Sequence, residues 1–226
     1  MLEGIDISHW ETVQDWPAVK KSGICFVYLK ATQGEKSVDR CFHKYRLACQ
    51  TVGLAWGAYH FYDYRYPAAS QAKHLIDTIG PTPPETRGML PPAVDLEPFT
   101  IWQDGERKVA ELPARQPLLD SLRTLIDTLK TAYDSAMLYT NPAMLKRLAP
   151  LPEWLAETPL WIAHYTPATQ PRITPFKNWL FWQYSDTGRV PGIFDAVDRD
   201  RFNGDEDELE RLTLLSPDGR EKNDGG

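Results

Sequence analysis

The sequence lacks long apolar runs, a signal-like start and an excess of basic residues. None of its stretches is long and apolar enough to cross a bilayer, so we expect neither a transmembrane helix nor a membrane partner. The opening residues 1–6 have no cationic region and no apolar core, and therefore predict no secretory signal. The formal net charge of −6 argues against nucleic acid as a partner.

Cysteine is also scarce. Cys25, Cys41 and Cys49 are odd in number, and their spacing matches no metal site. Cys25 lies in an apolar, strand-like run, and the other two are two turns apart in a helical pattern. We expect three buried, reduced thiols with no nucleophilic role. This usage predicts synthesis and folding in a reducing compartment, the cytoplasm.

The first 140 residues alternate strand and helix signals. Apolar runs predict the strands, and apolar residues at helical spacing predict the helices between them, two of which end at Gly53 and Gly80. This alternation predicts a parallel sheet with helices outside. The expected strands are 4–8, 24–31, 54–61, 92–97 and 136–140, and the expected helices are 17–21, 38–52, 68–79 and 114–133.

The pattern changes after residue 140. Residues 141–158 are rich in Pro and Leu and predict only short helical turns. Three further strands, at 160–165, 179–184 and 193–198, have no room for full crossover helices between them. Five strands with helices and three without predict an α/β fold: a TIM-like barrel of eight strands in the order (β/α)5(β)3.

No internal repeat or low-complexity linker divides the chain. We therefore expect one barrel domain over residues 1–215, followed by a polar, disordered tail at 216–226. The charged segment 98–113 comes directly after the fourth strand, a position suited to a loop at the barrel mouth.

Two acids, Asp95 and Glu97, stand at the end of the strand expected at 92–97. Side chains two residues apart on a strand project to one face, about 7 Å apart by the strand rise. Like charges this close do not ionise independently, so one acid would carry a raised pKa while the other stays charged. Cleavage of a glycosidic bond uses such a pair. In isolation, the same pattern would also fit a strand that ends in a solvated acidic turn.

Two distant acids change the balance between these interpretations. Asp6 lies in the first apolar run, and Asp198 lies in the last expected strand. The first and last strands of a closed barrel are neighbours, so these acids could share one mouth with Asp95 and Glu97. Barrel enzymes take their catalytic residues from the ends of several strands.

Aromatic residues gather at the same strand ends. Sugar rings have apolar faces and a rim of hydroxyls, which flat side chains with a polar group suit well. Any one of these residues could equally be a core residue, but as a group they fit a saccharide cleft. The aromatic residues concerned are Tyr59, Phe61, Tyr62, Trp161, Tyr165, Trp182 and Tyr184.

Seven short motifs are spread over nearly the whole chain: GIDISHW at 4–10, YLKATQG at 28–34, GAYHF at 57–61, PAVDLE at 92–97, LWIAHY at 160–165, WQYS at 182–185 and VDRDRF at 197–202. Taken together and in this order, they resemble the motifs of the family 25 glycoside hydrolases, the Chalaropsis-type lysozymes that cleave bacterial peptidoglycan. The resemblance implies a barrel of five βα units and three closing strands.

The resemblance also implies roles for individual residues. Glu97 matches the general acid, and Asp95 matches the acid that supports the acetamido group of the substrate, which favours a substrate-assisted route. Asp6 and Asp198 match two further family carboxylates that position the substrate or tune Glu97. Gln33 departs from the pattern, because many members have Glu there. The substrate-binding residues expected on these grounds are Tyr59, Tyr62, Trp161, Tyr165, Gln183 and Lys30.

The implied reaction is hydrolysis of the bond between N-acetylmuramic acid and N-acetylglucosamine, by a monomer without metal or cofactor. The expected partner is the peptidoglycan glycan strand, reached in the cell wall after release or non-classical export. Two other interpretations stay open. One is a metal-dependent hydrolase that holds Mg²⁺ or Mn²⁺ with the four acids, although His9, His60 and His164 show no zinc-type spacing. The other is a barrel that binds wall glycan without cleaving it.

Overall fold

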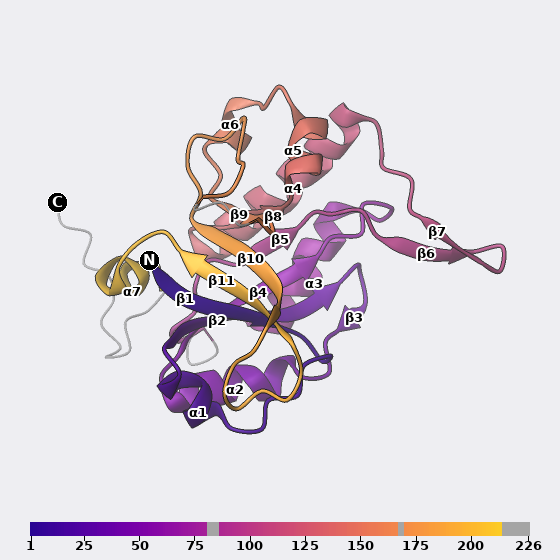
Figure 1. The fold of residues 1–226 in the computed structure, drawn as a ribbon. Helices are drawn as coiled ribbons and strands as arrows, with labels where there is room; N and C mark the ends of the chain where they lie inside the picture. Colours follow the sequence, from indigo (N-terminus) through magenta and orange to yellow (C-terminus); the bar gives the residue numbers. More distant parts are fainter. Residues whose placement is uncertain (81–85, 167–169, 214–226) are drawn as a thin grey trace.

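The computed structural model describes residues 1–80, 86–166 and 170–213. Eight of the nine strands in its main sheet close a barrel, because β1 pairs with both β2 and β11 (Figure 1). This confirms the predicted (β/α)5(β)3 order. The barrel strands are β1 (Leu2–Ile7), β2 (Ile24–Gln33), β4 (Ala55–Phe61), β5 (Ala93–Asp95), β8 (Met137–Thr140), β9 (Leu160–Ala163), β10 (Phe181–Gly188) and β11 (Val197–Phe202).

A helix follows each of the first five barrel strands. These are α1 (Trp16–Lys21), α2 (Phe42–Val52), α3 (Ala68–Ile79), α4 (Arg115–Tyr133) and α5 (Pro142–Leu148), and two short helices are added later, α6 (Glu153–Ala156) and α7 (Glu206–Leu212). Helix α2 begins four residues later than expected, since residues 37–38 form β3 (Ser37–Val38) along the end of β2. It ends at Gly53, whose φ of 68° is the left-handed conformation that glycine adopts without strain.

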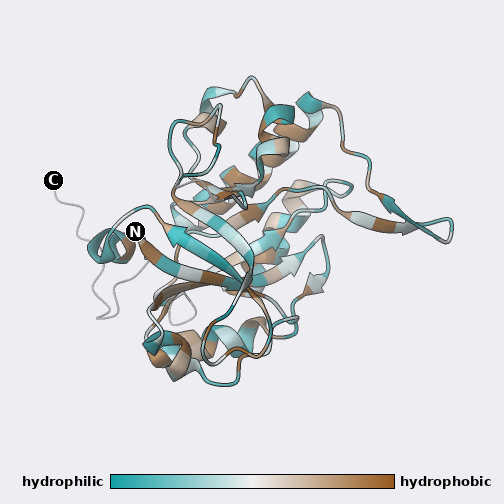
Figure 2. Cartoon of the chain, viewed as in Figure 1, coloured by the Kyte–Doolittle hydropathy of each residue, from teal (hydrophilic) through white to brown (hydrophobic). Residues whose placement is uncertain are grey.

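The last strand, β11, is antiparallel to both of its neighbours, whereas the other barrel strands pair in parallel. It therefore places its beginning, not its end, at the mouth of the barrel. The strand predicted at 193–198 is wrong in its bounds, because β11 spans Val197–Phe202. Figure 2 shows β11 as largely hydrophilic, which hid it from a search for apolar runs. Its outward residues Arg199 and Arg201 are paired with Glu3 of β1.

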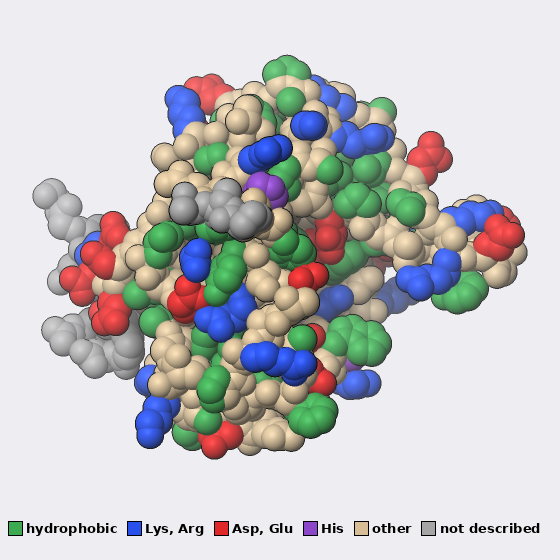
Figure 3. Space-filling model, viewed as in Figure 1, with side chains coloured by type: hydrophobic (Ala, Val, Ile, Leu, Met, Phe, Trp, Pro, Cys, Tyr) green, Lys and Arg blue, Asp and Glu red, His purple; other side chains and the backbone are tan. Residues whose placement is uncertain are grey.

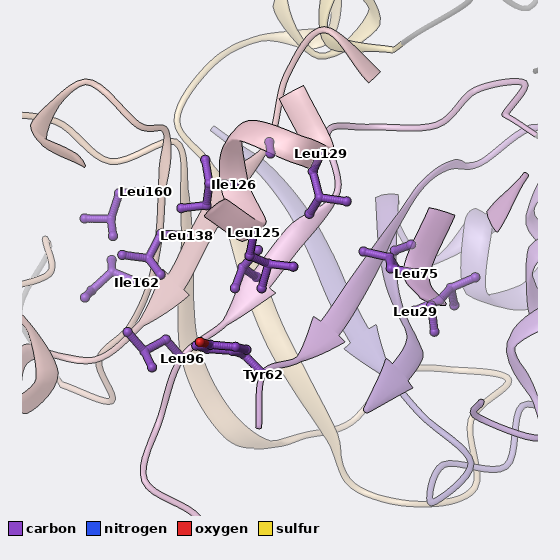
Figure 4. Close-up of a cluster of buried hydrophobic side chains, with 14 of the residues drawn as sticks. Leu29, Tyr62, Leu75, Leu96, Leu125, Ile126, Leu129, Leu138, Leu160 and Ile162 are labelled. Atoms are coloured by element: carbon purple, nitrogen blue, oxygen red, sulfur yellow. The ribbon is translucent and has the colours of Figure 1, made fainter. Parts of the chain in front are cut away.

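Two layers of apolar side chains hold the barrel together. Aromatic rings fill its interior, among them Phe26, Tyr28 and Phe181, whose centroids lie 5.0–6.4 Å apart. This filling explains Gly57 in the middle of β4, since a Cβ there would lie 2.0 Å from the Tyr28 ring. A second layer packs between the strands and the helices, with leucines of α3 and α4 against the barrel wall (Figure 4).

The segment expected as a loop at 98–113 contains a two-stranded hairpin, β6 (Thr100–Gln103) and β7 (Glu106–Val109). Asp104 and Gly105 join the strands with φ of 54° and 79°, as an Asp-Gly hairpin turn requires. The hairpin projects from the molecule beyond β5 and carries basic and acidic side chains (Figures 1 and 3).

Other expectations have mixed outcomes. Cys49 is buried as expected, but Cys25 and Cys41 are only partly buried, and all three are free thiols. The tail expected at 216–226 lies outside the described residues. Within the described ranges, no helix has both the length and the apolar character needed to cross a membrane.

Candidate active site

The predicted acids meet in one cavity of about 210 Å³ at the mouth of the barrel. Asp6, Asp95, Glu97 and Asp198 all line it, although β1, β5 and β11 are far apart in the sequence. Asp6 is the second-last residue of β1 and Asp198 is the second residue of β11, and the two residues are directly paired across the antiparallel ladder. Closure of the barrel therefore brings together the four acids that the sequence singled out.

Asp95 and Glu97 are fixed by the backbone between them. The Leu96 amide donates to the Tyr139 carbonyl oxygen at 2.9 Å, and Thr140 Oγ1 donates to the Leu96 carbonyl oxygen at 2.7 Å. Leu96 is thereby held in the core, while the acids on either side of it face the cavity.

The electrostatics of this pair differ from the expectation that one acid alone carries a raised pKa. Burial raises the pKa of both, and for Asp95 the charge of Glu97 raises it further. Asp95 is only 5% exposed, and among the described residues its Oδ1 has no hydrogen-bond partner. The cavity thus holds one acid with an unused oxygen beside a second, less buried acid that can keep its proton.

Lys30 supplies the opposing charge. Its ammonium lowers the pKa of both Asp95 and Glu97, and its Nζ lies 4.8 Å from the centroid of the Phe61 ring. Nζ also donates to Gln33 Oε1 at 2.9 Å. Because Gln33 is a neutral amide, this contact holds the ammonium in place without cancelling its charge.

Gln183 organises the opposite wall of the cavity. Its Nε2 donates to Asp6 Oδ2 at 2.7 Å and to Asp198 Oδ2 at 3.2 Å. Its Oε1 accepts from the hydroxyls of Tyr139 and Tyr165 at 2.8 and 2.7 Å. All the hydrogen-bonding positions of this amide are therefore used to hold two acids and two phenols in fixed positions.

Asp200 is a buried acid that the sequence reasoning missed. It is 0% exposed, and its Oδ1 accepts from Trp161 Nε1 at 2.8 Å. Burial raises its pKa to about 8, although hydrogen bonds from Trp161 and Asp6 oppose the shift. Burial and nearby acids raise the pKa of Asp198 to about 7, and burial with the charges of Asp200 and Asp198 raises that of Asp6 well above its usual range. The signal was present, since Asp200 lies two residues after Asp198 and so shares its face of the strand.

The predicted aromatic contacts divide into two groups. Tyr59 and Trp161 line the cavity, and Trp161 is buried. Tyr165 is half-exposed, and its hydroxyl donates to Gln183 Oε1. Tyr62 does not line the cavity. Its ring is buried in the outer core beside Leu96 and its hydroxyl contacts Ser121 Oγ of α4 at 2.6 Å (Figure 4), so the expected substrate contact is replaced by helix packing.

Several residues that line the cavity were not predicted, among them Trp10, Glu11 and Tyr139. Trp10 is 73% exposed at the edge of the cavity, Glu11 follows it, and Tyr139 is the strand residue that bonds Gln183. Trp10 ends the GIDISHW motif, which could have indicated it.

The three histidines considered as ligands do not converge. His60 lies in the core between Thr32 and Gln71, and burial lowers its pKa to about 4. His9 contacts Asp39, and His164 accepts from the Arg172 amide. Within the part of the chain that the structure describes, no three His, Cys, Asp or Glu side chains are grouped to hold a metal ion.

Known proteins resemble this chain over most of its length. Lysozyme M1 of Streptomyces globisporus is 31% identical over 222 residues, which cover 90% of this chain and 68% of that protein. YegX, an uncharacterized protein of Escherichia coli O157:H7, is 32% identical over 214 residues, covering 92% and 72%. The crystal structure of the Streptomyces coelicolor lysozyme superposes with a TM-score of 0.82 at 28% identity, covering 94% of this chain and 97% of that one.

The family assignment follows from the match and from the site. The family model for glycosyl hydrolases family 25 matches residues 5–193, a stretch that begins beside Asp6 and includes Asp95 and Glu97. The chain therefore belongs to the glycosyl hydrolases of family 25 and is a glycoside hydrolase.

Proposed function

We propose that the chain is a lysozyme that hydrolyses the bond between N-acetylmuramic acid and N-acetylglucosamine in bacterial peptidoglycan. Family membership and the likeness to Lysozyme M1 support this substrate class. The observation that carries the proposal is the pair in the cavity: Glu97 with a raised pKa beside Asp95 with a buried, unused oxygen.

In this proposal Glu97 is the general acid. Its carboxyl gives its proton to the glycosidic oxygen as the bond to the anomeric carbon breaks, and burial favours the protonated form by raising the pKa of Glu97. The acetamido oxygen of the same sugar attacks the anomeric carbon and forms a cyclic oxazolinium ion. Water then opens this ring, and the Glu97 carboxylate takes up the proton that the water loses.

Asp95 supports the acetamido group. Its Oδ1 is aimed at no protein donor in the described residues, so it can accept the N–H of the substrate. Such a bond favours the charged form of a carboxyl whose pKa burial has raised, as does the nearby ammonium of Lys30. Asp6 and Asp198, held by Gln183, would position the sugar and influence the protonation of Glu97.

Two further expectations remain part of the proposal. The barrel and its helices extend to Leu212, which supports one domain over residues 1–215. We also expect a monomer that acts on the cell wall after release or export.

The test is the analysis of the products. Purified peptidoglycan is digested, its new reducing ends are reduced with borohydride, and the fragments are identified by mass spectrometry. Cleavage at the proposed bond yields muramitol. Glucosaminitol in its place would contradict the bond assignment, and no release of fragments would contradict the proposed activity on peptidoglycan.

A further inference from the structure

A second cavity of about 240 Å³ adjoins the catalytic cavity, and the Lys30 side chain lines both. We call it the side pocket. Its walls come from the end of β2, from β3 and from the residues that follow them, including Gln33, Ser37 and Arg40, together with His9. A substrate in the catalytic cavity could therefore extend a substituent past Lys30 into the side pocket.

The acid that lines the side pocket is occupied by the protein. Asp39 is 8% exposed, and its Oδ2 accepts from the His9 amide at 3.1 Å and contacts His9 Nδ1 at 2.6 Å. Its Oδ1 accepts from the Cys41 amide at 2.9 Å. Both oxygens are thus engaged, and the carboxylate is not free to bind a cation entering from outside.

The remaining polar groups can donate. Lys30 Nζ bonds the neutral amide of Gln33, and Arg40 Nη2 donates to the His9 carbonyl oxygen at 3.5 Å. Neither cation forms an ion pair within residues 1–80, 86–166 and 170–213. With Gln33 Oε1 taken up by Lys30, its NH₂ group and the Ser37 hydroxyl add further donors.

Among the described residues, neither Lys30 nor Arg40 has a carboxylate within ion-pair distance, although the charges of Asp95, Asp39 and Glu97 act on Lys30. Two such cations beside neutral donors match an anion with planar, paired oxygens. We propose that the side pocket binds a carboxylate that the glycan carries on its muramyl residue. This inference rests on the proposed function. The lactyl ether of that sugar ends either in a free carboxylate or in an attached peptide that has carboxylates of its own. The enzyme would thus recognise the substituent of the sugar as well as the glycan chain.

The test is binding, measured by calorimetry, in the Glu97→Gln background so that no turnover occurs. Three soluble tetrasaccharides of alternating N-acetylglucosamine and N-acetylmuramic acid are compared. One has free lactyl carboxylates, the second carries a short peptide with free carboxylates, and the third carries the same peptide with every carboxylate converted to a carboxamide. We expect at least one carboxylate fragment to bind about tenfold more tightly than the carboxamide fragment, since charge-assisted hydrogen bonds are the stronger ones.

Arg40→Gln, added to this background, should reduce that preference about fivefold, because Arg40 is exposed and its contribution is screened by solvent. The matched control is Lys36→Gln, which removes an exposed cation from the same loop but does not line the side pocket. It should leave the preference unchanged. A higher salt concentration should weaken the preference in the unsubstituted pocket.

Equal binding of all three fragments would overturn the inference, as would an equal loss in the Arg40 and Lys36 variants. Preference for the free lactyl fragment or for the peptide fragment would identify the source of the carboxylate. The proposed function is judged separately, by whether the wild-type chain releases muramitol-ended products. A binding preference without cleavage would therefore contradict the activity and leave the side pocket in place.

Discussion

Asp200→Asn is expected to make the stability of this enzyme less sensitive to pH. Asp200 is 0% exposed and is hydrogen bonded to Asp6, another buried acid. Its pKa is about 8 in the folded chain, against an ordinary value of 3.8. Because the folded value is the higher one, the protonated carboxyl favours folding at low pH, and this contribution is lost as the pH rises from about 4 through about 8.

The size of the effect follows chiefly from burial, which disfavours the charged form of Asp200. Arg199 offsets part of this, since its charge lowers the pKa of Asp200, whereas Asp198 adds to it. We therefore expect the wild-type chain to lose about 2 kcal/mol more of its unfolding free energy between pH 5 and pH 9 than Asp200→Asn does. The asparagine can still accept from Trp161 and can donate to Asp6.

Urea unfolding of both proteins at pH 5 and pH 9 measures this difference directly. Asp127→Asn is the control, because Asp127 lies exposed on α4 and pairs only with Arg123 among the described ion pairs. It should change the pH dependence little. If wild type and Asp200→Asn lose the same unfolding free energy between pH 5 and pH 9, the raised pKa of Asp200 does not contribute to stability, and the prediction is wrong.

The other predictions concern catalysis and packing. Glu97→Gln should lower peptidoglycan hydrolysis by a factor on the order of 10² to 10⁴ without lowering the melting temperature, and near-wild-type turnover would contradict its role as general acid. Asp95→Asn should reduce the single-turnover rate much more than glycan affinity, and glycan without N-acetyl groups should be a very poor substrate; full activity on that glycan would rule out the substrate-assisted route. Gly57→Ala should cost about 1–3 kcal/mol in urea unfolding, because the added Cβ would lie 2.0 Å from the Tyr28 ring, and an unchanged midpoint would refute this packing. A chelator should leave hydrolysis unchanged, and loss of activity restored by Mg²⁺ or Mn²⁺ would favour the metal-dependent alternative.

The alternation of strands and helices was readable because most barrel strands are apolar on both faces. Their inner residues fill the barrel and their outer residues contact helices, so they stand out as continuous apolar runs. Strand β11 does not have this pattern. Its inner face carries Asp198 and Asp200, and its outer face carries Arg199 and Arg201. Its bounds were therefore misplaced, and Asp200 was overlooked as a result.

The aromatic residues show a similar limit. Tyr59 and Tyr62 both lie near the end of β4, and strand alternation places them on opposite faces without showing which face lines the cavity. Only the packing of the helix against the barrel decided that Tyr62 is a core residue. The sequence could not predict the side pocket for the same reason, because the pocket forms only when β3 and the residues after it fold beside Lys30.

The sequence by itself determined the class of fold, the order of its strands and the four acids of the site, because hydrophobic periodicity and short motifs are local properties of the chain. The tertiary structure decided how those acids behave. Their pKa values depend on burial and on charges brought together by barrel closure, such as Asp6 beside Asp198 and Asp200. The acids that interact are nearly 200 positions apart in the sequence, and no local pattern predicts how close they lie in the folded chain.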